Sequence, residues 1–330
     1  MSENIKIMHE KDLQKVTTTQ TVTKIFVKIA LYAFLIFMAI VVVFPFYFMI
    51  LSSLKSYDVY ESITEPVLYI DLRPDNPLIN PENRIMWERI VFSNYVDVFK
   101  STDLGRMFLN TVIVGIVSTL LSLVITVLSA FAFARLEFKG KNALFAALLG
   151  TMMIPGELFT ITNYVTVSEL GWIDSYQVLI IPFLVSIFYI YLLRQNFLQI
   201  PNELYLAAKV DGTSDIKYLW KVMIPLALPS LISITILKMM GAWNSYAWPN
   251  LVCKDESYQL ITNGLRSAQF YVYDLTPGKN GEMIEQVRDG VVNYPVQMAA
   301  VTLVSIPLFL VFIFLRKYIM KGVSRSGIKG

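Results

Sequence analysis

The sequence is poor in the residues on which most enzyme sites depend. Its 330 residues include a single histidine, His9, and a single cysteine, Cys253. One histidine rules out most Ser-His, Cys-His and histidine-metal sites, and one cysteine rules out an intrachain disulfide. The sequence therefore indicates neither an enzyme nor a metal centre, and we expect Cys253 to have a packing role.

Charge is also scarce. Charged residues make up 16% of the chain and hydrophobic residues 55%, whereas about a quarter of a soluble domain is usually charged. The charges gather in clusters between long uncharged runs. This distribution is typical of a polytopic membrane protein, and nothing in it favours binding to nucleic acid.

A phosphate-binding loop is missing too. The two Gly-Lys pairs, Gly140-Lys141 and Gly278-Lys279, are each followed by asparagine and lack the preceding glycine of the nucleotide-binding pattern. Any ATP hydrolysis linked to this chain is therefore expected on another polypeptide.

Long apolar runs are what the sequence does contain. A helix needs about 20 mostly apolar residues to cross the hydrocarbon of a membrane. The sequence predicts an all-α fold with six spans, at 25–52, 108–134, 143–165, 177–193, 224–248 and 295–315. The remaining segments are 1–24, 53–107, 135–142, 166–176, 194–223, 249–294 and 316–330. Pro155-Gly156 and Pro182 interrupt the third and fourth runs, where we expect kinks.

Basic residues fix the predicted orientation, because positive charge is retained on the cytoplasmic side. The segments 1–24, 135–142, 194–223 and 316–330 are rich in Lys and Arg, whereas 53–107 has an excess of acids. We therefore expect both termini, and the segment 194–223, to lie in the cytoplasm of a cell with a bacterial-type membrane.

The segment 202–225 stands out as a polar island between two spans. After Pro201, Asn202 is a good N-cap, and a short helix follows as far as Val210. Asp211-Gly212 ends that helix, since glycine tolerates the left-handed conformation at a helix end, and a second helix is expected from 215 to 223. The spacing alone leaves open whether this is an ordinary loop packed on its own bundle or a knob that docks on a soluble partner.

A family resemblance decides between these interpretations. Ala207, Ala208, Asp211, Gly212 and the 223–225 ending match the EAA loop of ABC-importer permeases. Further matching stretches are IPNEL at 200–204, MMIPG at 152–156, LGWIDSY at 170–176, AWNSYAWP at 242–249 and the terminal GVSRSGIKG. From the first span to the last residue the chain resembles the carbohydrate-uptake class of type I permeases, above all the smaller membrane subunit of maltose and multiple-sugar importers.

The chain departs from this pattern at three positions. Leu206 stands where the family has the glutamate of E-A-A, Tyr205 stands at the usually acidic neighbour, and Ser245 replaces the acid after the Trp-Asn pair. We therefore expect docking to depend on apolar contacts from Leu204, Tyr205 and Leu206 instead of a salt bridge.

The resemblance implies one permease subunit of an ATP-driven importer for a sugar or oligosaccharide. Its partners would be a second, different permease, two ATPase subunits that hold ATP and Mg²⁺, a solute-binding protein outside the cytoplasm, and membrane lipid. This chain itself would bind no cofactor. The residues expected to couple to the ATPase are Asn202, Glu203, Leu204, Tyr205, Leu206, Ala207, Ala208, Asp211, Gly212, Thr213 and Lys217.

Five residues are candidates for the substrate pathway: Glu157, Lys238, Trp243, Asn244 and Tyr246. Ionisable residues at membrane depth are functional candidates because they are costly unless they face a cavity or a partner. Lys238 could line the path, pair with Glu157, pair with another subunit, or reach the membrane surface. The aromatic residues could stack on sugar rings, or belong to the interfacial belt in which Trp and Tyr concentrate.

The segments 53–107 and 249–294 are long for such a family and could enlarge the docking platform for the binding protein, or be neutral insertions. The basic tail 316–330 could hold orientation against anionic lipid or reach the ATPase interface. Two other classes stay open. An ion-coupled secondary transporter would normally contain internal repeats and several buried acids, and a membrane scaffold or receptor would have spans and a docking knob without transport.

Overall fold

The computed structural model describes residues 2–55, 57, 86–268, 270–277 and 283–324. The chain divides into two compact units, Met1–Asn94 and Tyr95–Gly330, which are treated separately. The element that crosses the boundary is helix α3, Met86–Ser101.

The first unit is built on one long helix, α1, Ser2–Ser53. Its section Lys24–Ser53 is apolar and long enough to cross a membrane, and it contains the first predicted run. The C-terminal end of α1 is bonded by Asn94, whose side-chain amide donates to the carbonyl oxygens of Ser53 at 2.8 Å and Lys55 at 2.7 Å. These bonds satisfy carbonyls that a helix end leaves without an internal partner.

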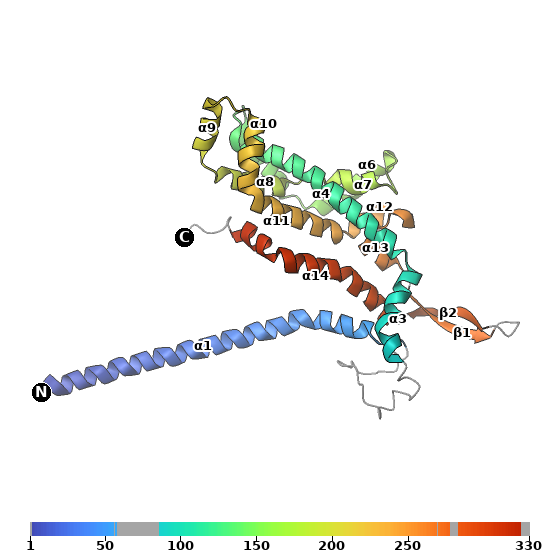
Figure 1. Ribbon diagram of the computed structural model, residues 1–330, viewed down its shortest axis with the longest axis horizontal. Coiled ribbons are helices and arrows are strands. Elements are labelled where there is room, and N and C mark those ends of the chain that lie inside the picture. Colours follow the sequence, from blue (N-terminus) through green and yellow to red (C-terminus); the bar gives the residue numbers. More distant parts are fainter. Residues whose placement is uncertain (1, 56, 58–85, 269, 278–282, 325–330) are drawn as a thin grey trace. The chain divides into compact units, whose positions relative to one another are not determined.

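The second unit contains the remaining described helices and both strands (Figure 1). Its elements up to the polar island are α4 Leu104–Arg135, α5 Lys141–Thr151, a 3₁₀ turn Gly156–Phe159, α6 Thr160–Glu169, α7 Tyr176–Ile180, a 3₁₀ turn Ile181–Phe183 and α8 Ile187–Leu198. From the island onward they are α9 Asn202–Val210, α10 Asp215–Tyr218, a π-helical segment Leu219–Met223, α11 Ile224–Trp243, α12 Ala247–Val252, a 3₁₀ turn Glu256–Tyr258, α13 Ile261–Ser267, strands β1 Tyr271–Pro277 and β2 Met283–Val292, and α14 Tyr294–Ser324.

Spanning helices dominate the part of the chain that the structure describes. Four are long and apolar enough to cross: Lys24–Ser53, Leu104–Arg135, Asp215–Trp243 and Tyr294–Arg316. Two further helix pairs are long and apolar enough to cross only if each pair is counted as one bent span. Lys141–Thr151 and Gly156–Glu169 meet at a bend of 83°, and Tyr176–Phe183 and Ile187–Leu198 meet at a bend of 46°. The bends fall at Pro155-Gly156 and after Pro182, where the sequence predicted kinks. The boundaries of the six predicted spans stay predictions.

A β-hairpin is the departure from helix within the described residues. β1 and β2 pair antiparallel, with Tyr273 opposite Val287 and Thr276 opposite Ile284. The hairpin lies within 249–294, one of the two long segments noted in the sequence, and Asn293 N–H bonds the Phe270 carbonyl at its base. The predicted all-α membrane fold is confirmed, and the hairpin adds a small sheet outside the predicted spans.

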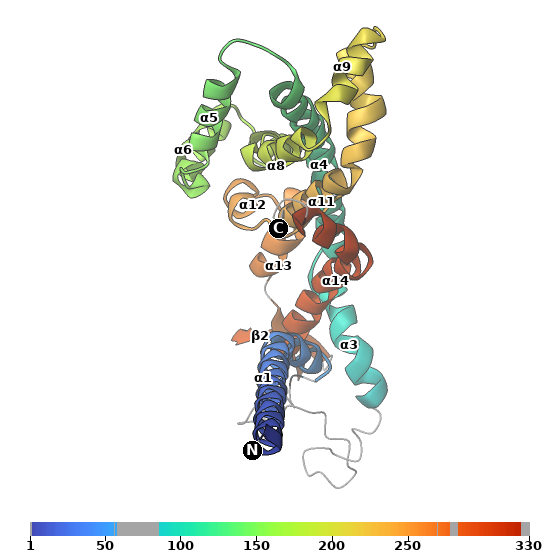
Figure 2. The ribbon, with the colours of Figure 1, turned by 90° about the vertical axis from the view of Figure 1, so that its left-hand side faces the viewer.

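Apolar side chains at the two ends of α4 form separate cores. At one end Phe131, Phe197, Tyr218 and Met223 belong to a cluster shared by α4, α8, α10 and α11. At the other end Met107 packs with α13 and the start of α14. Both views place α9 at the first end and α13 toward the second (Figures 1 and 2). The polar island therefore rests on a well-packed base.

Cys253 follows α12 and is buried, with only 4% of its surface exposed. Burial, and secondarily the negative charge of Asp174, raise the pKa of its thiol to about 12. Because the thiolate is the nucleophile, we expect a maleimide at pH 7 to label the folded protein at least about 100-fold more slowly than the detergent-denatured chain. Mass spectrometry of the labelled chain measures this directly, since no other cysteine is present. Equal rates would contradict the buried position.

Candidate functional site: a helical loop and a cavity within the bundle

The helical loop 202–217 is attached to the bundle at its first residue. The prediction that Asn202 caps the helix is wrong: α9 begins at Asn202 and the cap position is Pro201, which has no side-chain bond to the helix. The Asn202 side-chain oxygen instead accepts from Arg135 Nη1 at 3.4 Å. Pro201 suits the position directly before α9, because its φ is fixed and it has no N–H that would need a helical partner.

Arg135, at the end of α4, is the anchor of this attachment. Its side chain is 7% exposed, and Nη2 donates to the carbonyl oxygens of Phe197 at 2.8 Å and Ile200 at 2.5 Å. These carbonyls lie at the C-terminal end of α8, where a positive charge also favours the helix dipole. Sequence reasoning counted Arg135 only as an orientation charge, and nothing in its local pattern indicated this role.

The turn after α9 is a Schellman motif. Gly212 N–H bonds the Lys209 carbonyl at 3.1 Å and Thr213 N–H bonds the Ala208 carbonyl at 2.8 Å, while Gly212 has φ +67°. Residues with a Cβ are strained in that region, and glycine is not. Ser214 then caps α10, its hydroxyl oxygen accepting from Lys217 N–H at 3.4 Å. The predicted helix, turn and helix are therefore present.

A polar clamp joins α9 to α10 across the turn. The Tyr205 hydroxyl donates to Asp215 Oδ1 at 2.8 Å, and Lys209 Nζ lies 2.7 Å from the same oxygen. Lys209 also lies over the Tyr205 ring, 5.4 Å from its centroid, and the ring packs on Tyr218. Two helices fixed at both the turn and the clamp move as one unit.

The clamp explains one difference from the sequence interpretation. Tyr205 was expected to dock on a partner through apolar contact, but its hydroxyl is bonded within the loop and its ring is half-buried against the core. Its role in docking stays a prediction, with less of its surface free than the sequence suggested.

Titration of the clamp follows from its contacts. The bond from Lys209, followed by that from Tyr205, lowers the pKa of Asp215, and the bond to Asp215 raises the pKa of Lys209. The Asp215 contribution is present above its unfolded pKa of about 3.9, and is lost as pH falls through the lower folded value. The Lys209 contribution is present below about 10.4, and is lost as pH rises through its raised value. The clamp is therefore complete from about pH 5 to 9.

We expect Asp215→Asn to lower the transport rate by about two- to fivefold, because an exposed ion pair is worth at most about 1 kcal/mol. The loss should be constant between pH 5.5 and 8.5, where the wild-type clamp does not titrate. Uptake into vesicles at several pH values measures it, with Asp97→Asn in the exposed Asp97–Lys100 pair of α3 as the control. A loss that appears at only one end of that pH range would contradict this assignment.

The outer face of the loop is apolar and exposed. Its large side chains, with their exposed fractions, are Leu204 45%, Leu206 56%, Val210 89%, Ile216 66% and Trp220 63%. Ala207 and Lys217 are exposed beside them, whereas Ala208 and Thr213 are half-buried. The sequence interpretation named Val210 among the apolar residues of the first helix, but it proposed neither Val210 nor Ile216 nor Trp220 as a coupling residue. Leu206 and Val210 are one turn apart, a spacing that places both on one helix face. We call Leu206 and Val210 the apolar face of the loop; Leu204 projects from another side of α9, and Trp220 follows the loop.

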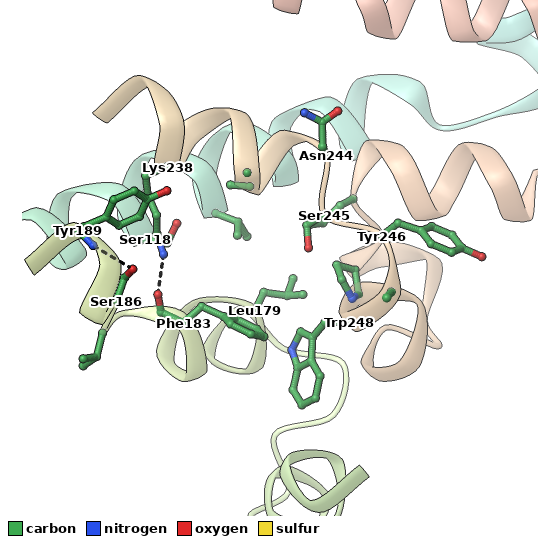
Figure 3. A pocket seen from close by; sticks show the side chains of 17 residues that line it. Ser118, Leu179, Phe183, Ser186, Tyr189, Lys238, Asn244, Ser245, Tyr246 and Trp248 are labelled. Atoms are coloured by element: carbon green, nitrogen blue, oxygen red, sulfur yellow. Dashed lines mark hydrogen bonds between the residues drawn. The ribbon is translucent and has the colours of Figure 1, made fainter. Parts of the chain in front are cut away.

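A cavity of about 690 Å³ opens between α4, the α7–α8 region and the end of α11. It is lined by Val114, Ser118, Leu179, Phe183, Val185, Ser186, Tyr189, Lys238, Gly241, Ala242, Asn244, Ser245, Tyr246, Ala247, Trp248, Pro249 and Leu260. In Figure 3, Lys238 and Tyr189 lie at one end of the cavity and Tyr246 and Trp248 at the other. This volume is within the range of about 300–1,000 Å³ that is usual for small-molecule sites.

Three of the five predicted pathway residues line this cavity: Lys238, Asn244 and Tyr246. Trp243 and Glu157 do not. The Trp243 ring packs edge-on against Phe108 at 5.5 Å and its Nε1–H bonds the Val304 carbonyl at 3.3 Å. Glu157 is exposed in the 3₁₀ turn after Pro155. The pairing of Lys238 with Glu157 is not formed, since Lys238 Nζ donates to the Phe183 carbonyl at 2.6 Å.

Several lining residues were missed from the sequence. Tyr189 and Ser186 come from the start of α8, and Ser118 comes from α4. Trp248, which the sequence placed in an aromatic and amide cluster at the end of the fifth span, lines the cavity from α12, and its Nε1–H bonds the Val178 carbonyl at 2.9 Å. Ser245, where the family pattern has an acid, also lines the cavity. No periodic pattern joins residues so far apart in the chain. Within the residues that the structure describes, no group of three or more His, Cys, Asp or Glu could hold a metal ion.

Comparison with known proteins agrees with this architecture. A family model, the binding-protein-dependent transport system inner membrane component, matches residues 122–325. That range includes the helical loop, α11 and most of the cavity. The chain therefore belongs to the family of binding-protein-dependent transport system inner membrane components.

Curated relatives are similar over nearly the whole chain. The arabinooligosaccharides transport system permease protein AraQ of Bacillus subtilis is 27% identical over 304 residues, 92% of this chain and 96% of that protein. The sn-glycerol-3-phosphate transport system permease protein UgpE of Rhizobium meliloti is 29% identical over 286 residues, 86% and 91% of the two chains. A probable ABC transporter permease of Mycoplasma pneumoniae is 31% identical over 306 residues, 90% of this chain and 87% of that protein.

The fold also matches a solved structure. A chain of a bacterial ABC transporter involved in the import of the acidic polysaccharide alginate superimposes with a TM-score of 0.70. It is 23% identical, with coverage of 88% of this chain and 95% of that chain, so the match shows the fold. The chain is thus a membrane-embedded permease subunit of an ABC importer, a transport protein and not an enzyme, and the family predicted from the sequence is confirmed.

Proposed function

We propose that the chain forms half of the translocation pathway of an ATP-driven importer and couples to a separate ATPase through residues 202–217. The observation that carries this proposal is the helical loop itself: a motif fixed at Arg135, at the Gly212 turn and at the Asp215 clamp, which nevertheless exposes the apolar face. Exposed apolar residues on a rigid support are typical of a docking surface.

The loop and the cavity are joined by one continuous helical rod. Asp215–Trp243 runs unbroken through α10, the π-helical segment and α11 for 29 residues, about 43 Å at 1.5 Å per residue. This rod begins at Asp215, which belongs to the clamp, and it carries Lys238, which lines the cavity. A displacement of the loop by a closing ATPase pair would therefore move one wall of the cavity, which is the mechanical requirement for alternating access.

We propose a sugar or oligosaccharide as the cargo. Relatives are described as permeases for arabinooligosaccharides and for polygalacturonan and rhamnogalacturonan. The cavity presents aromatic rings, on which sugar C–H faces stack, together with hydroxyl and amide groups that bond sugar hydroxyls. The candidates in the pathway remain Lys238, Asn244 and Tyr246, supplemented by Tyr189 and Trp248.

The proposed assembly has a second permease of different sequence, two ATPase subunits and a solute-binding protein. ATP and Mg²⁺ would be held on the ATPase subunits. Both termini of this chain would face the cytoplasm, because the basic segments and the helical loop must lie on the side of the ATPase.

The test is to purify the tagged chain in mild detergent from its native membrane and to identify the proteins that accompany it by mass spectrometry. We expect an ATPase with a phosphate-binding loop and a second permease, and ATP-dependent sugar uptake after reconstitution with the binding protein. Uptake that needs no ATP and stops with an ionophore would indicate an ion-coupled transporter. A complex without transport, whose ATP hydrolysis ignores solute, would indicate a scaffold.

A further inference from the structure

The cavity contains one charged side chain. Of the 17 residues that line it, Lys238 alone carries a charge at neutral pH. It lies 14 residues after Ile224 on α11, about 21 Å along the helix axis, within one of the candidate membrane spans. A cation at such a depth is expensive unless it meets a partner or a water-filled cavity.

The partners of Lys238 in the described residues are neutral. Its ammonium donates one hydrogen bond, 2.6 Å long, to the carbonyl oxygen of Phe183 on the facing wall (Figure 3). No carboxylate in the described part of the chain lies within ion-pair distance of Nζ, and Glu157 is not among the lining residues. An ammonium has three N–H donors, so two donors and the whole of the positive charge remain available to a molecule in the cavity.

The neighbours of Lys238 suit a carbohydrate. Ser186 and Tyr189 lie beside it, and Ser245 and Trp248 lie toward the other end of the cavity. The Trp248 ring meets Phe183 edge to face at 5.6 Å, and this contact holds an aromatic surface at the cavity wall. A ligand that fits both ends has a sugar ring or rings for the aromatic end and a negative group for the ammonium.

We propose that the cavity recognises an anionic saccharide, such as an oligosaccharide of uronic acids, with its carboxylate on Lys238. This inference rests on the proposed function of sugar import and narrows the cargo to one chemical class. A charge-assisted bond between ammonium and carboxylate is about twice as strong as a neutral one. Neutral sugars would leave the ammonium with its single carbonyl partner.

The probes are pairs of trisaccharides that differ only at C6, with a carboxylate in the uronide and a hydroxymethyl group in the neutral sugar, in the galacto, gluco and manno series. Binding to the purified importer complex in nanodiscs of phosphatidylcholine is measured by calorimetry without the binding protein. This arrangement avoids the selectivity of the binding protein. Repeating the titration with anionic phosphatidylglycerol in the nanodisc tests whether a lipid headgroup occupies Lys238 instead.

Two variants of Lys238 separate charge from shape. Lys238→Met keeps the length of the side chain and removes the charge, and Lys238→Arg keeps the charge. Lys139→Met removes an exposed lysine from the 135–142 segment and is the matched control. Each variant complex is first checked for copurification of both permeases and of the ATPase.

We expect one uronide to bind the wild-type complex at least about 10-fold more tightly than its neutral partner, and Lys238→Met to lower uronide affinity by about 10- to 100-fold. Lys238→Arg should retain most of the uronide affinity, and Lys139→Met should leave it unchanged. The affinity for the neutral sugar should be the same in every variant. Equal affinities for all pairs, no binding of any uronide, or an unchanged Lys238→Met complex would overturn the proposal.

Loss of the second permease from the Lys238→Met complex would show that Lys238 pairs with that subunit, and would overturn the proposal as well. The proposal would also be overturned if phosphatidylglycerol displaced the uronide in proportion to the phosphatidylglycerol content of the nanodisc. Failure here is distinguishable from failure of the proposed function. ATP-dependent uptake of a neutral sugar by a wild-type complex that binds uronide and neutral sugar equally would keep the importer and reject the anionic cargo. Absence of ATP-dependent uptake of any sugar would reject both.

Discussion

Gly212→Pro is expected to reduce ATP-dependent uptake by about 100-fold or more while the chain still inserts in the membrane. Gly212 has φ +67°, whereas proline holds φ near −65° and would remove the N–H that bonds the Lys209 carbonyl. Proline also disfavours the conformation of the preceding Asp211, which lies at φ −73° and ψ 3°. Together these effects cost about 3 kcal/mol or more at the turn, enough to misdirect α10.

Gly212→Asn is the matched control, because asparagine tolerates the left-handed conformation at a helix end. No atom lies within 4 Å of a Cβ built at Gly212, so the asparagine side chain has room. We expect Gly212→Asn to retain at least about half of the wild-type uptake. The measurements are copurification of the ATPase and uptake into proteoliposomes at equal protein levels. If Gly212→Pro transports as well as Gly212→Asn, the turn has no part in coupling.

Arg135→Met is expected to lower both the thermal stability of the purified complex and the retention of the ATPase. The change removes the donor from the buried Ile200 carbonyl oxygen, at a cost of about 1–3 kcal/mol. The Phe197 carbonyl loses one bond but still accepts from Ile200 N–H at 3.3 Å. With about 2–4 °C per kcal/mol for a unit of this size, a loss of about 1–3 kcal/mol should lower the midpoint of thermal unfolding by about 2–12 °C. The bond to Asn202, the first residue of α9, is lost at the same time.

Two comparisons isolate the role of Arg135. Arg135→Lys keeps the charge but not the planar guanidinium group that reaches several acceptors. We therefore expect its midpoint of thermal unfolding to lie between those of Arg135→Met and the wild type. Arg106→Met removes an exposed arginine that bonds the Ser257 carbonyl at 3.2 Å, and should shift the midpoint by less than about 2 °C. An Arg135→Met complex with the wild-type midpoint would show that water or neighbouring groups satisfy these carbonyls.

Local features of the fold were predictable because local chemistry decides them. The kinks at Pro155-Gly156 and after Pro182 follow from the missing N–H and fixed φ of proline. The turn at Asp211-Gly212 follows from the freedom of glycine in the left-handed region, and the second helix begins at Asp215 because Ser214 caps it. The start of α9 was misassigned because the contact of Asn202 is with Arg135, 67 residues earlier.

The candidate site was predictable only in part. Lys238, Asn244 and Tyr246 were singled out because charge, amide and aromatic groups are unusual near a membrane span. Tyr189 and Ser118 were not, since each is ordinary in its own segment and meets the others only when α4 and α8 pack beside α11. In the same way, the clamp of Tyr205 and Lys209 on Asp215 depends on how α9 folds back over α10.

The sequence by itself determined that this is a membrane protein with a helix, a turn and a second helix in the segment 202–223, because hydrophobic run length, charge distribution and the Gly212 turn are properties of short segments. Its family resemblance then indicated a permease. Only the tertiary structure decided which side chains are free to act. It placed Arg135 on the end of α8, turned the Tyr205 hydroxyl inward, left Val210 and Trp220 exposed, and set Lys238 in a cavity with a neutral partner. The physical reason is that burial, ion pairing and cavity lining depend on the rotation of each helix about its axis, which packing between distant segments fixes.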